Sequence, residues 1–440
     1  MRTSIAAAVT LAVAIAATTQ AQTDPGPRGG PPPTAGPPPI GTPPAGPPPL
    51  SGMPLQGLSA AESQIFAKAR DTFAEISDVP DGLGPRFNLD SCAGCHAHPA
   101  PGGSSPPFNP QTVVAAKFGA INRLPSFIQQ NGPVRVVRFR NGPNGMPDGG
   151  VHDLFVITGR SDAPAGCRIQ QPDFSNQANL VFRIPTPVFG LGLIEALSDA
   201  TLRANLDANF GRKGPLGIRG RFNTSGNDGT ITRYGWKAQN KSLLMFSGEA
   251  YNVEIGVTNE LFPQEREDDP ACATNPLPED QTNLNNATLS DIELQSMFMR
   301  LLAPPAPTPS DPSIDNGRAL FDATGCSLCH TPTLTTGNAA SAALRAQSVN
   351  LYSDLAIHRM GQGLADGITQ GAAQGDEWRT APLWGLGDRL FLLHDGRSSN
   401  LIDAIQQHDS PGSEAHGVIA NYQSLTPGQK QDLLNFLRSL

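Results

Sequence analysis

One short stretch, "DSCAGCHAHPAPGGSSP" at positions 90–106, contains a pentapeptide that returns at positions 324–332 as "TGCSLCHTP". Both copies have the pattern C-x-x-C-H, in which two thiols three positions apart can reach the two vinyl groups of one haem. The imidazole that follows is then held beneath the iron as an axial ligand. A structural zinc site would need four ligands, and a redox C-x-x-C pair does not require the histidine. The sequence therefore predicts two covalently bound haem c groups. The predicted attachment and ligand residues are Cys92, Cys95 and His96 in the first copy and Cys326, Cys329 and His330 in the second.

Helical patterns flank each copy of the pentapeptide. Before the first copy, Ser59 and Glu62 make a capping box, and apolar residues follow at helical spacing through Phe73. Ser290 and Glu293 open a second capped helix that stops before the proline-rich stretch at 303–312. The second copy follows the helical stretch "IDNGRALFDATG", and Thr426 caps a final amphipathic helix. We therefore expect a mainly α fold with two cytochrome c-type haem domains.

Short strands are predicted only in the first of these domains. The stretch "VRVVRF" at 134–139 alternates as a strand does and could pair with "HDLFVITG" at 152–159, while a third candidate lies around Val181. The first domain is thus expected to be enlarged by short β-strands and long loops. The predicted divisions are a signal peptide at 1–21, a Pro/Gly-rich disordered linker at 22–54, an N-terminal catalytic haem domain at 55–305 and a C-terminal electron-transfer haem domain at 306–440.

The composition limits the class of partner. The chain has 440 residues, a net charge of -8 and only 16% charged residues. An acidic chain of this kind argues against nucleic acid or an anionic membrane as the main partner.

The N-terminus has the pattern of a secretory signal. Arg2 precedes a short apolar run, and small residues end at Ala21. The run is too short to span a bilayer comfortably, so no membrane span is expected. A periplasmic or otherwise exported location follows, and it permits a disulfide between Cys167 and Cys272, which we favour over two buried free thiols.

Several further stretches resemble the dihaem oxidoreductase family of peroxidase-like proteins, also labelled thiol oxidoreductases. This family is related to bacterial dihaem cytochrome c peroxidases and more distantly to dihaem rubber oxygenases. The matching stretches, spread from about residue 80 to the C-terminus, are "GLGPRFNLDSCAGCHAHPAPGGSSP", "GLGLIEA", "RYGWKAQ", "VEIGVTNE", "CSLCHTP", "YSDLAIHRMGQGLAD", "EWRTAPLWGLG" and "LLHDGRSSNLIDAIQQH". The thiol label has no support here, since no C-x-x-C pair is free of a predicted haem.

The resemblance implies a second axial ligand for the C-terminal haem. In the peroxidases this ligand follows an H-D-G motif, here at 394–396, and lies at the end of a helix. His408 stands at that place, where the peroxidases usually have Met. Imidazole in place of thioether would lower the reduction potential. Met360 is the rival ligand, and His358 and His394 are weaker rivals.

The resemblance also implies a carboxylate on the open face of the N-terminal haem. Glu254 matches the family's E-x-G position, and a carboxylate near the iron can move a proton between the two peroxide oxygens. Glu260 is the alternative acid, and Glu195 has the pattern of a helix-end residue. Trp236 and Tyr234 lie where the relatives place an aromatic residue between the haems, although a packed core role is equally consistent with them.

One departure from the peroxidases concerns the resting state. Some of them block the N-terminal haem with a histidine from a loop after the binding motif, but here no histidine lies between His98 and His152. His98 is two residues from His96 and belongs to the proximal side. We therefore expect the N-terminal haem to be open or water-bound at rest.

These features predict an exported dihaem c-type oxidoreductase that reduces hydrogen peroxide at the N-terminal haem, with electrons relayed through the C-terminal haem. A small electron-donor protein, a cytochrome or a cupredoxin, is the expected partner. The alternatives are a dioxygen-dependent dihaem oxygenase of an apolar substrate and a dihaem electron carrier without enzymatic activity.

Overall fold

The computed structural model describes residues 22–28, 49–117, 119, 123–142, 144–146, 155–156, 162–266 and 269–440. The fold is mainly helical with four small two-stranded sheets among these residues. The α-helices are α1 (Ala60–Phe73), α2 (Cys92–Cys95), α3 (Gln111–Lys117), α4 (Leu191–Glu195), α5 (Asp199–Asp207), α6 (Phe210–Leu216), α7 (Leu243–Ala250), α8 (Asp291–Leu301), α9 (Pro312–Thr324), α10 (Leu401–Gln406), α11 (His416–Ser424) and α12 (Pro427–Ser439). The shorter helical turns are η1 (Gln177–Asn179), η2 (Tyr251–Ile255), η3 (Cys326–Leu328) and η4 (Leu386–Asp388).

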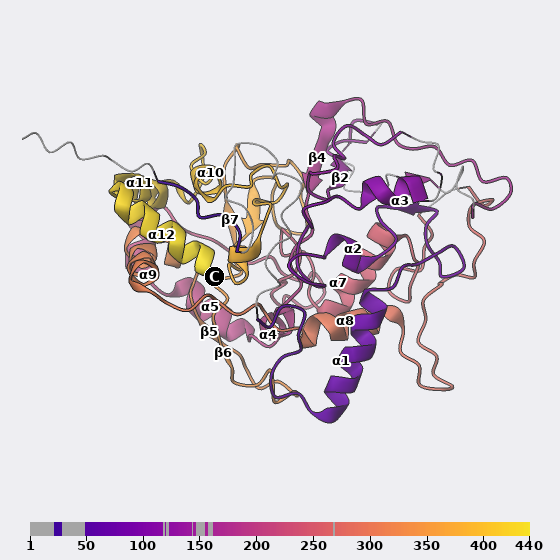
Figure 1. Ribbon diagram of the computed structural model, residues 1–440, viewed down its shortest axis with the longest axis horizontal. Coiled ribbons are helices and arrows are strands. Elements are labelled where there is room, and N and C mark those ends of the chain that lie inside the picture. Colours follow the sequence, from indigo (N-terminus) through magenta and orange to yellow (C-terminus); the bar gives the residue numbers. More distant parts are fainter. Residues whose placement is uncertain are drawn as a thin grey trace, which may run out of the picture.

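Two helix pairs organise the molecule. Helix α1 packs against α8 at one end, and α9 packs against α12 at the other (Figure 1). In both pairs the first helix leads toward a C-x-x-C-H stretch, and the second closes that half of the chain. The capping boxes predicted at Ser59 and Ser290 are present, and Thr426 forms a third.

The same aromatic contact joins the helices of each pair. Phe73 of α1 packs on Phe298 of α8 with ring centroids 4.6 Å apart. Phe321 of α9 packs on Phe436 of α12 at 5.4 Å. Each first-helix phenylalanine also lies beside the histidine of its pentapeptide, Phe73 at 6.1 Å from His96 and Phe321 at 6.4 Å from His330. The two copies of the pentapeptide therefore have equivalent supports.

The strand pairing differs from the sequence prediction. Strand β2 (Val136–Phe139) pairs antiparallel with β4 (Leu180–Arg183), whereas β3 (Phe155–Val156) pairs with β1 (Arg86–Phe87). The bonds of Asn179 explain the choice, because its carbonyl accepts from the Arg140 amide at 2.9 Å and its side chain exchanges two hydrogen bonds with the Asn141 backbone. The remaining strands pair β5 (Leu334–Thr335) with β6 (Ser348–Val349), and β7 (Ile357–Arg359) with β8 (Glu377–Arg379).

Part of the predicted disordered linker at 22–54 is ordered. The Asp24 carboxylate is buried and accepts two hydrogen bonds of 2.8 Å from the Arg438 guanidinium. It also accepts from the amide of Leu401, the first residue of α10, at 2.7 Å. Arg28 makes a two-point ion pair with Asp388. Composition alone could not reveal this segment, because its ion pairs join residues that are 360 and 414 positions apart in the sequence.

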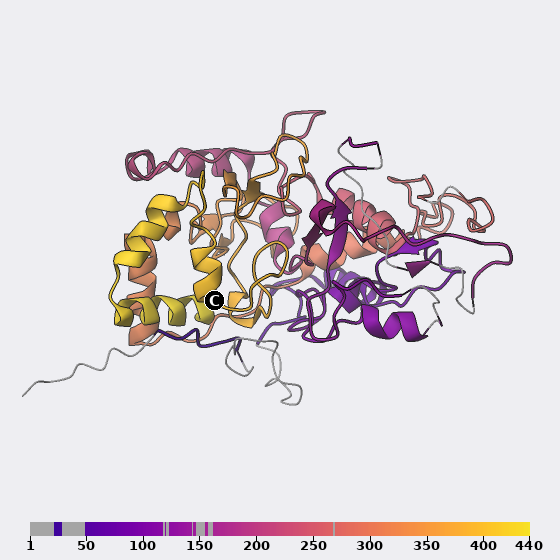
Figure 2. The ribbon, with the colours of Figure 1, turned by 90° about the horizontal axis from the view of Figure 1, so that it is seen from above.

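The two halves are not separated cleanly. Figure 2 shows the magenta helices that follow α4 lying over the helices of the C-terminal half. Leu216 and Ile218 pack with Leu328 and Val418, and the Asn205 amide donates to the Thr331 hydroxyl at 3.1 Å. The boundary near residue 305 therefore stays a prediction. Among the residues described, no helix has the length and apolar character needed to cross a membrane.

Candidate functional site

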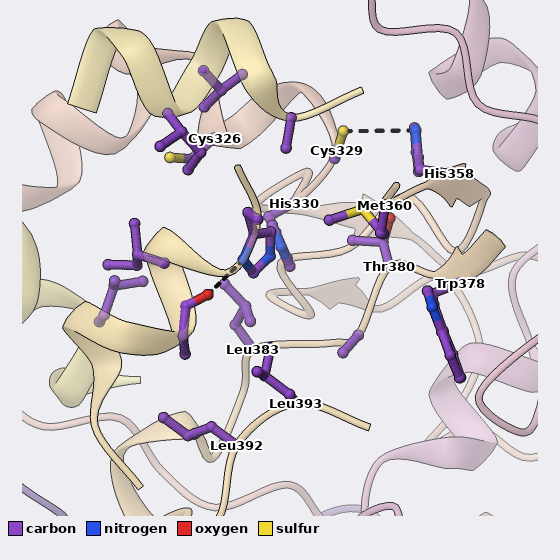
Figure 3. A pocket seen from close by; sticks show the side chains of 18 of the residues that line it. Cys326, Cys329, His330, His358, Met360, Trp378, Thr380, Leu383, Leu392 and Leu393 are labelled. Carbon is purple, nitrogen blue, oxygen red and sulfur yellow. Dashed lines mark hydrogen bonds between the residues drawn. The ribbon is translucent and has the colours of Figure 1, made fainter. Parts of the chain in front are cut away.

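The larger cavity lies in the C-terminal half and has a volume of about 240 Å³. Cys326 lines it from η3, and Cys329 and His330 follow directly after that turn (Figure 3). His408 reaches the same cavity from the end of α10, and leucine side chains make up much of the remaining wall. Two thiols and the imidazoles of His330 and His408 therefore meet in one largely apolar space, which His358 and His394 also line.

Backbone carbonyls orient both imidazoles. The Nδ1 atom of His330 lies 3.1 Å from the Tyr352 carbonyl oxygen, and that of His408 lies 2.7 Å from the Ala404 carbonyl oxygen. A carbonyl can only accept, so each Nδ1 carries the hydrogen and each Nε2 keeps its lone pair. Burial lowers the pKa of His330 to about 4, and His408 adds repulsion. Both rings are thus held neutral, as metal-ligating imidazoles are.

The rival ligands differ in whether other residues already bind their donor atoms. Met360 lines the cavity as His408 does. His358 is already committed, because its Nε2 lies 3.0 Å from Asp354 and its Nδ1 lies 2.9 Å from Glu414. Cys329, Asp354 and His358 also bring their donor atoms within 4.8 Å of one another, but the two carboxylate bonds leave no ring nitrogen of His358 free for a metal. His394 stacks on Trp378 with ring centroids 3.9 Å apart, and burial lowers its pKa well below the ordinary value.

The second cavity has a volume of about 160 Å³ and lies in the N-terminal half. Cys92, Cys95 and His96 line it together. The Nδ1 atom of His96 lies 3.2 Å from the Gly103 carbonyl oxygen, as in the C-terminal half. Burial lowers the pKa of His96 to about 4, although its hydrogen bonds to the backbone of Gly103 and Thr186 act to raise it. No histidine other than His96 lines this cavity among the residues described, and His152 lies outside them.

Glu254 lines the N-terminal cavity from η2, which is a π-helical turn. Such turns are rare and often mark functional sites. The Asn88 side-chain amide donates to the Glu254 carboxylate at 2.9 Å, and the Asn88 backbone amide donates to the Glu254 carbonyl at 2.8 Å. These paired bonds hold the half-buried carboxylate at the cavity wall.

The other predicted acids are elsewhere. Glu260 is exposed and accepts a hydrogen bond from the Thr282 amide. Glu195 forms an ion pair with Arg300 at 2.6 Å. The sequence prediction missed a different carboxylate, Glu249 of α7, which also lines the N-terminal cavity and accepts from the Asn240 side chain. Its position five residues before Glu254 was the available signal.

Trp236 lines both cavities. Its indole nitrogen donates to the Ile184 carbonyl at 2.9 Å, which sets the orientation of the ring. The ring lies 6.5 Å from Trp378 and 6.4 Å from His394, in edge-to-face contacts. Tyr234 is instead buried in the hydrophobic core and donates to the Leu191 carbonyl at 3.2 Å. Of the two predicted aromatics, only Trp236 lies between the cavities.

The remaining two cysteines form a disulfide. Cys167 and Cys272 are joined by an S–S bond of 2.01 Å and are both buried. They pack with Ile169 in a small cluster apart from both cavities.

Three solved structures are distant matches. The diheme peroxidase BthA from Burkholderia thailandensis E264 is 15% identical, with a TM-score of 0.30, over 64% of this chain and 92% of that chain. A Kuenenia stuttgartiensis hydrazine synthase is 14% identical, with a TM-score of 0.35, over 93% of this chain and 100% of that chain. A MauG-like protein associated with microbial copper homeostasis is 16% identical, with a TM-score of 0.29, over 59% of this chain and 91% of that chain.

No curated protein matches the chain significantly. A family model does match, over residues 146–440, and its description is "Di-haem oxidoreductase, putative peroxidase". The match covers most of the chain, including the second pentapeptide, Glu254 and His408. The chain therefore belongs to the di-haem oxidoreductase family.

Proposed function

We propose that this protein is an exported dihaem c-type oxidoreductase that reduces hydrogen peroxide at the N-terminal haem, with electrons relayed through the C-terminal haem. The observation that carries the proposal is the difference between two otherwise similar cavities. The C-terminal cavity has His408 as a second imidazole whose Nε2 is not engaged by a carboxylate, whereas the described lining of the N-terminal cavity has no histidine besides His96 and includes the carboxylate of Glu254.

The residues of each cavity suit a covalently bound haem. Cys92 and Cys95 share one cavity with His96, and Cys326 and Cys329 share the other with His330. Burial raises the pKa of Cys92 to about 12 and that of Cys326 to about 11, so these thiols are not surface nucleophiles. Bound haem supplies a redox-active iron that binds a small oxidant when one axial position is open.

Glu254 is the proposed proton carrier. Reduction of hydrogen peroxide to two waters consumes two electrons and two protons, and a proton must move from one peroxide oxygen to the other before the O–O bond breaks. The Glu254 carboxylate can accept the proton from one peroxide oxygen and donate it to the other. Asn88, which donates to the carboxylate at 2.9 Å, keeps it in place. Glu249, which lines the same cavity, is the proposed source of further protons.

Export is the second part of the proposal. The disulfide between Cys167 and Cys272 supports it, because disulfides persist in oxidising compartments. The predicted signal peptide at 1–21 lies outside the described residues.

Peroxide-dependent oxidation of a reduced small cytochrome tests the activity. We expect Glu254→Gln to lower the rate by about 100-fold or more, since positioned acid–base groups contribute 10²–10⁴. Glu260→Gln, on an exposed side chain, is the matched control and should keep the wild-type rate. A Glu254→Gln rate equal to that of the control would contradict the proposal. Dioxygen bound to the purified protein would favour an oxygenase instead.

A further inference from the structure

Most of the buried cations in the described part of the chain are paired with carboxylates, although Lys213 donates to two backbone carbonyls instead. Arg183 and Lys237 share Asp366, at 2.5 Å and 3.3 Å. Arg438 is paired with Asp24 in the same way. This is the usual solution, because an uncompensated charge in a low-dielectric interior costs several kcal/mol.

Two arginines on the wall of the C-terminal cavity depart from this rule. Arg379 is only 8% exposed, and its guanidinium donates to the carbonyls of Gly235 and Thr380. Arg389 donates to the Pro382 carbonyl at 2.9 Å, and its Nε has no partner. Within the described part of the chain, neither guanidinium forms an ion pair with a carboxylate.

The two arginines line the same cavity. Burial lowers the pKa of both Arg379 and Arg389 to about 10, and for Arg379 the positive charge of Arg389 contributes to this lowering. Asp388, the neighbour of Arg389 in the sequence, is engaged by Arg28 through two hydrogen bonds. The carboxylate of Glu414, which lines the cavity, is bound to His358 at 2.9 Å. The cavity wall therefore carries two positive charges that the protein does not compensate.

The rest of the wall indicates what kind of molecule supplies the missing charge. Leu383, Leu386, Leu392 and Leu393 line the same space. A ligand that fits must be largely apolar and must carry two anionic groups at one edge. A haem has this character, with two propionate carboxylates on an apolar macrocycle.

We propose that Arg379 and Arg389 bind the two propionate carboxylates of the haem in the C-terminal cavity. The proposal rests on the proposed function for the presence of that haem. Guanidinium groups suit the role because they present paired donors to a carboxylate in a fixed plane. The bound carboxylates would in turn remove the repulsion between the two side chains.

Redox titration of the holoprotein tests the charge. A nearby cation favours ferrous iron over ferric iron, so Arg379→Gln and Arg389→Gln should each lower the reduction potential of the C-terminal haem. We expect the ratio of reduced to oxidised haem at a fixed potential to fall by about tenfold, which is about 59 mV for one electron. Arg389→Lys keeps the positive charge, so its reduction potential should stay close to that of the wild type. Arg318→Gln, on a side chain that is 51% exposed, should leave the potential unchanged.

Different results would contradict the proposed function and the proposal that Arg379 and Arg389 bind the propionates. Fewer than two haems per wild-type chain would remove the basis in the proposed function. Two haems per chain and an unchanged low-spin C-terminal signal, with wild-type potentials in both Gln variants, would overturn the arginine proposal alone. A crystal structure of the wild-type holoprotein gives a test that does not depend on the variants folding. It should place propionate oxygens within hydrogen-bonding distance of both guanidinium groups, and propionates directed elsewhere would contradict the proposal.

Discussion

Asp24→Asn perturbs the contact that fastens the N-terminal segment to the C-terminal half. The carboxylate is 1% exposed, and it binds both Arg438 and the first amide of α10. The substitution keeps the size of the side chain but leaves the buried Arg438 guanidinium without its counter-charge. Breaking a buried pair in this way costs about 3–5 kcal/mol. We expect the free energy of unfolding to fall by about that amount.

Guanidinium chloride unfolding of the mature holoprotein, followed by far-UV circular dichroism, measures this loss. The control is Asp71→Asn, because Asp71 pairs with Arg70 on the surface with side chains 74% and 51% exposed. Such exposed pairs contribute about 0–1 kcal/mol. If Asp24→Asn unfolds at the same denaturant concentration as Asp71→Asn, the segment does not stabilise the fold as described.

The pH dependence of this loss has a definite sign. Burial alone would raise the pKa of Asp24, but the hydrogen bonds and charge of Arg438 outweigh it and lower the pKa below its ordinary value. A carboxyl group with a lowered folded-state pKa contributes stability above its unfolded-state pKa of about 3.9 and loses that contribution as pH falls through the folded-state value. The difference between wild type and Asp24→Asn should therefore be full at pH 7 and shrink in acid. A difference that grows in acid would refute this reasoning.

Three further substitutions test other parts of the structure. His408→Met should raise the reduction potential of the C-terminal haem in a redox titration, because a thioether ligand favours ferrous iron. Met360→Leu should leave that potential unchanged. A potential that changes in Met360→Leu and not in His408→Met would make Met360 the ligand. Trp236→Phe should slow electron transfer between the haems, measured by flash reduction, while Tyr234→Phe should not; equal rates in all three proteins would exclude Trp236 from the path. Gly317→Ala should destabilise the protein by about 1–3 kcal/mol through overpacking, since an added Cβ would lie 2.1 Å from the Asp432 carbonyl oxygen. Gly428→Ala is the control, because its added Cβ would meet nothing within 4 Å. Equal thermal stability of the two variants would contradict the α9–α12 contact.

The sequence could predict those elements whose stabilising residues lie within a few positions of one another. The capped helices beginning after Ser59 and Ser290 follow from capping and apolar spacing, and the structure contains both. The prediction of the two haem-attachment stretches likewise rests on five consecutive residues each, and it stays a prediction. His408 is nominated through the family resemblance, which places a ligand at the end of a helix after the H-D-G motif, and α10 does end two residues before it.

The features that sequence missed depend on contacts across long distances in the chain. The pairing of β2 with β4 is decided by Asn179, about 40 positions from its partners. The docking of Asp24 on Arg438 joins opposite ends of the chain, so a proline-rich composition hid it. The lack of a carboxylate partner for buried Arg379 and half-buried Arg389 is visible only in the structure.

The central claim is that the two cavities hold haems with different ligation. Electron paramagnetic resonance of the purified ferric protein, with a pyridine haemochrome assay to count the haems, tests it most directly. The account predicts two haems per chain, one low-spin signal from the centre with His330 and His408 and one high-spin signal from the centre with His96. Two low-spin signals without a high-spin component would contradict it and would leave a simple electron carrier.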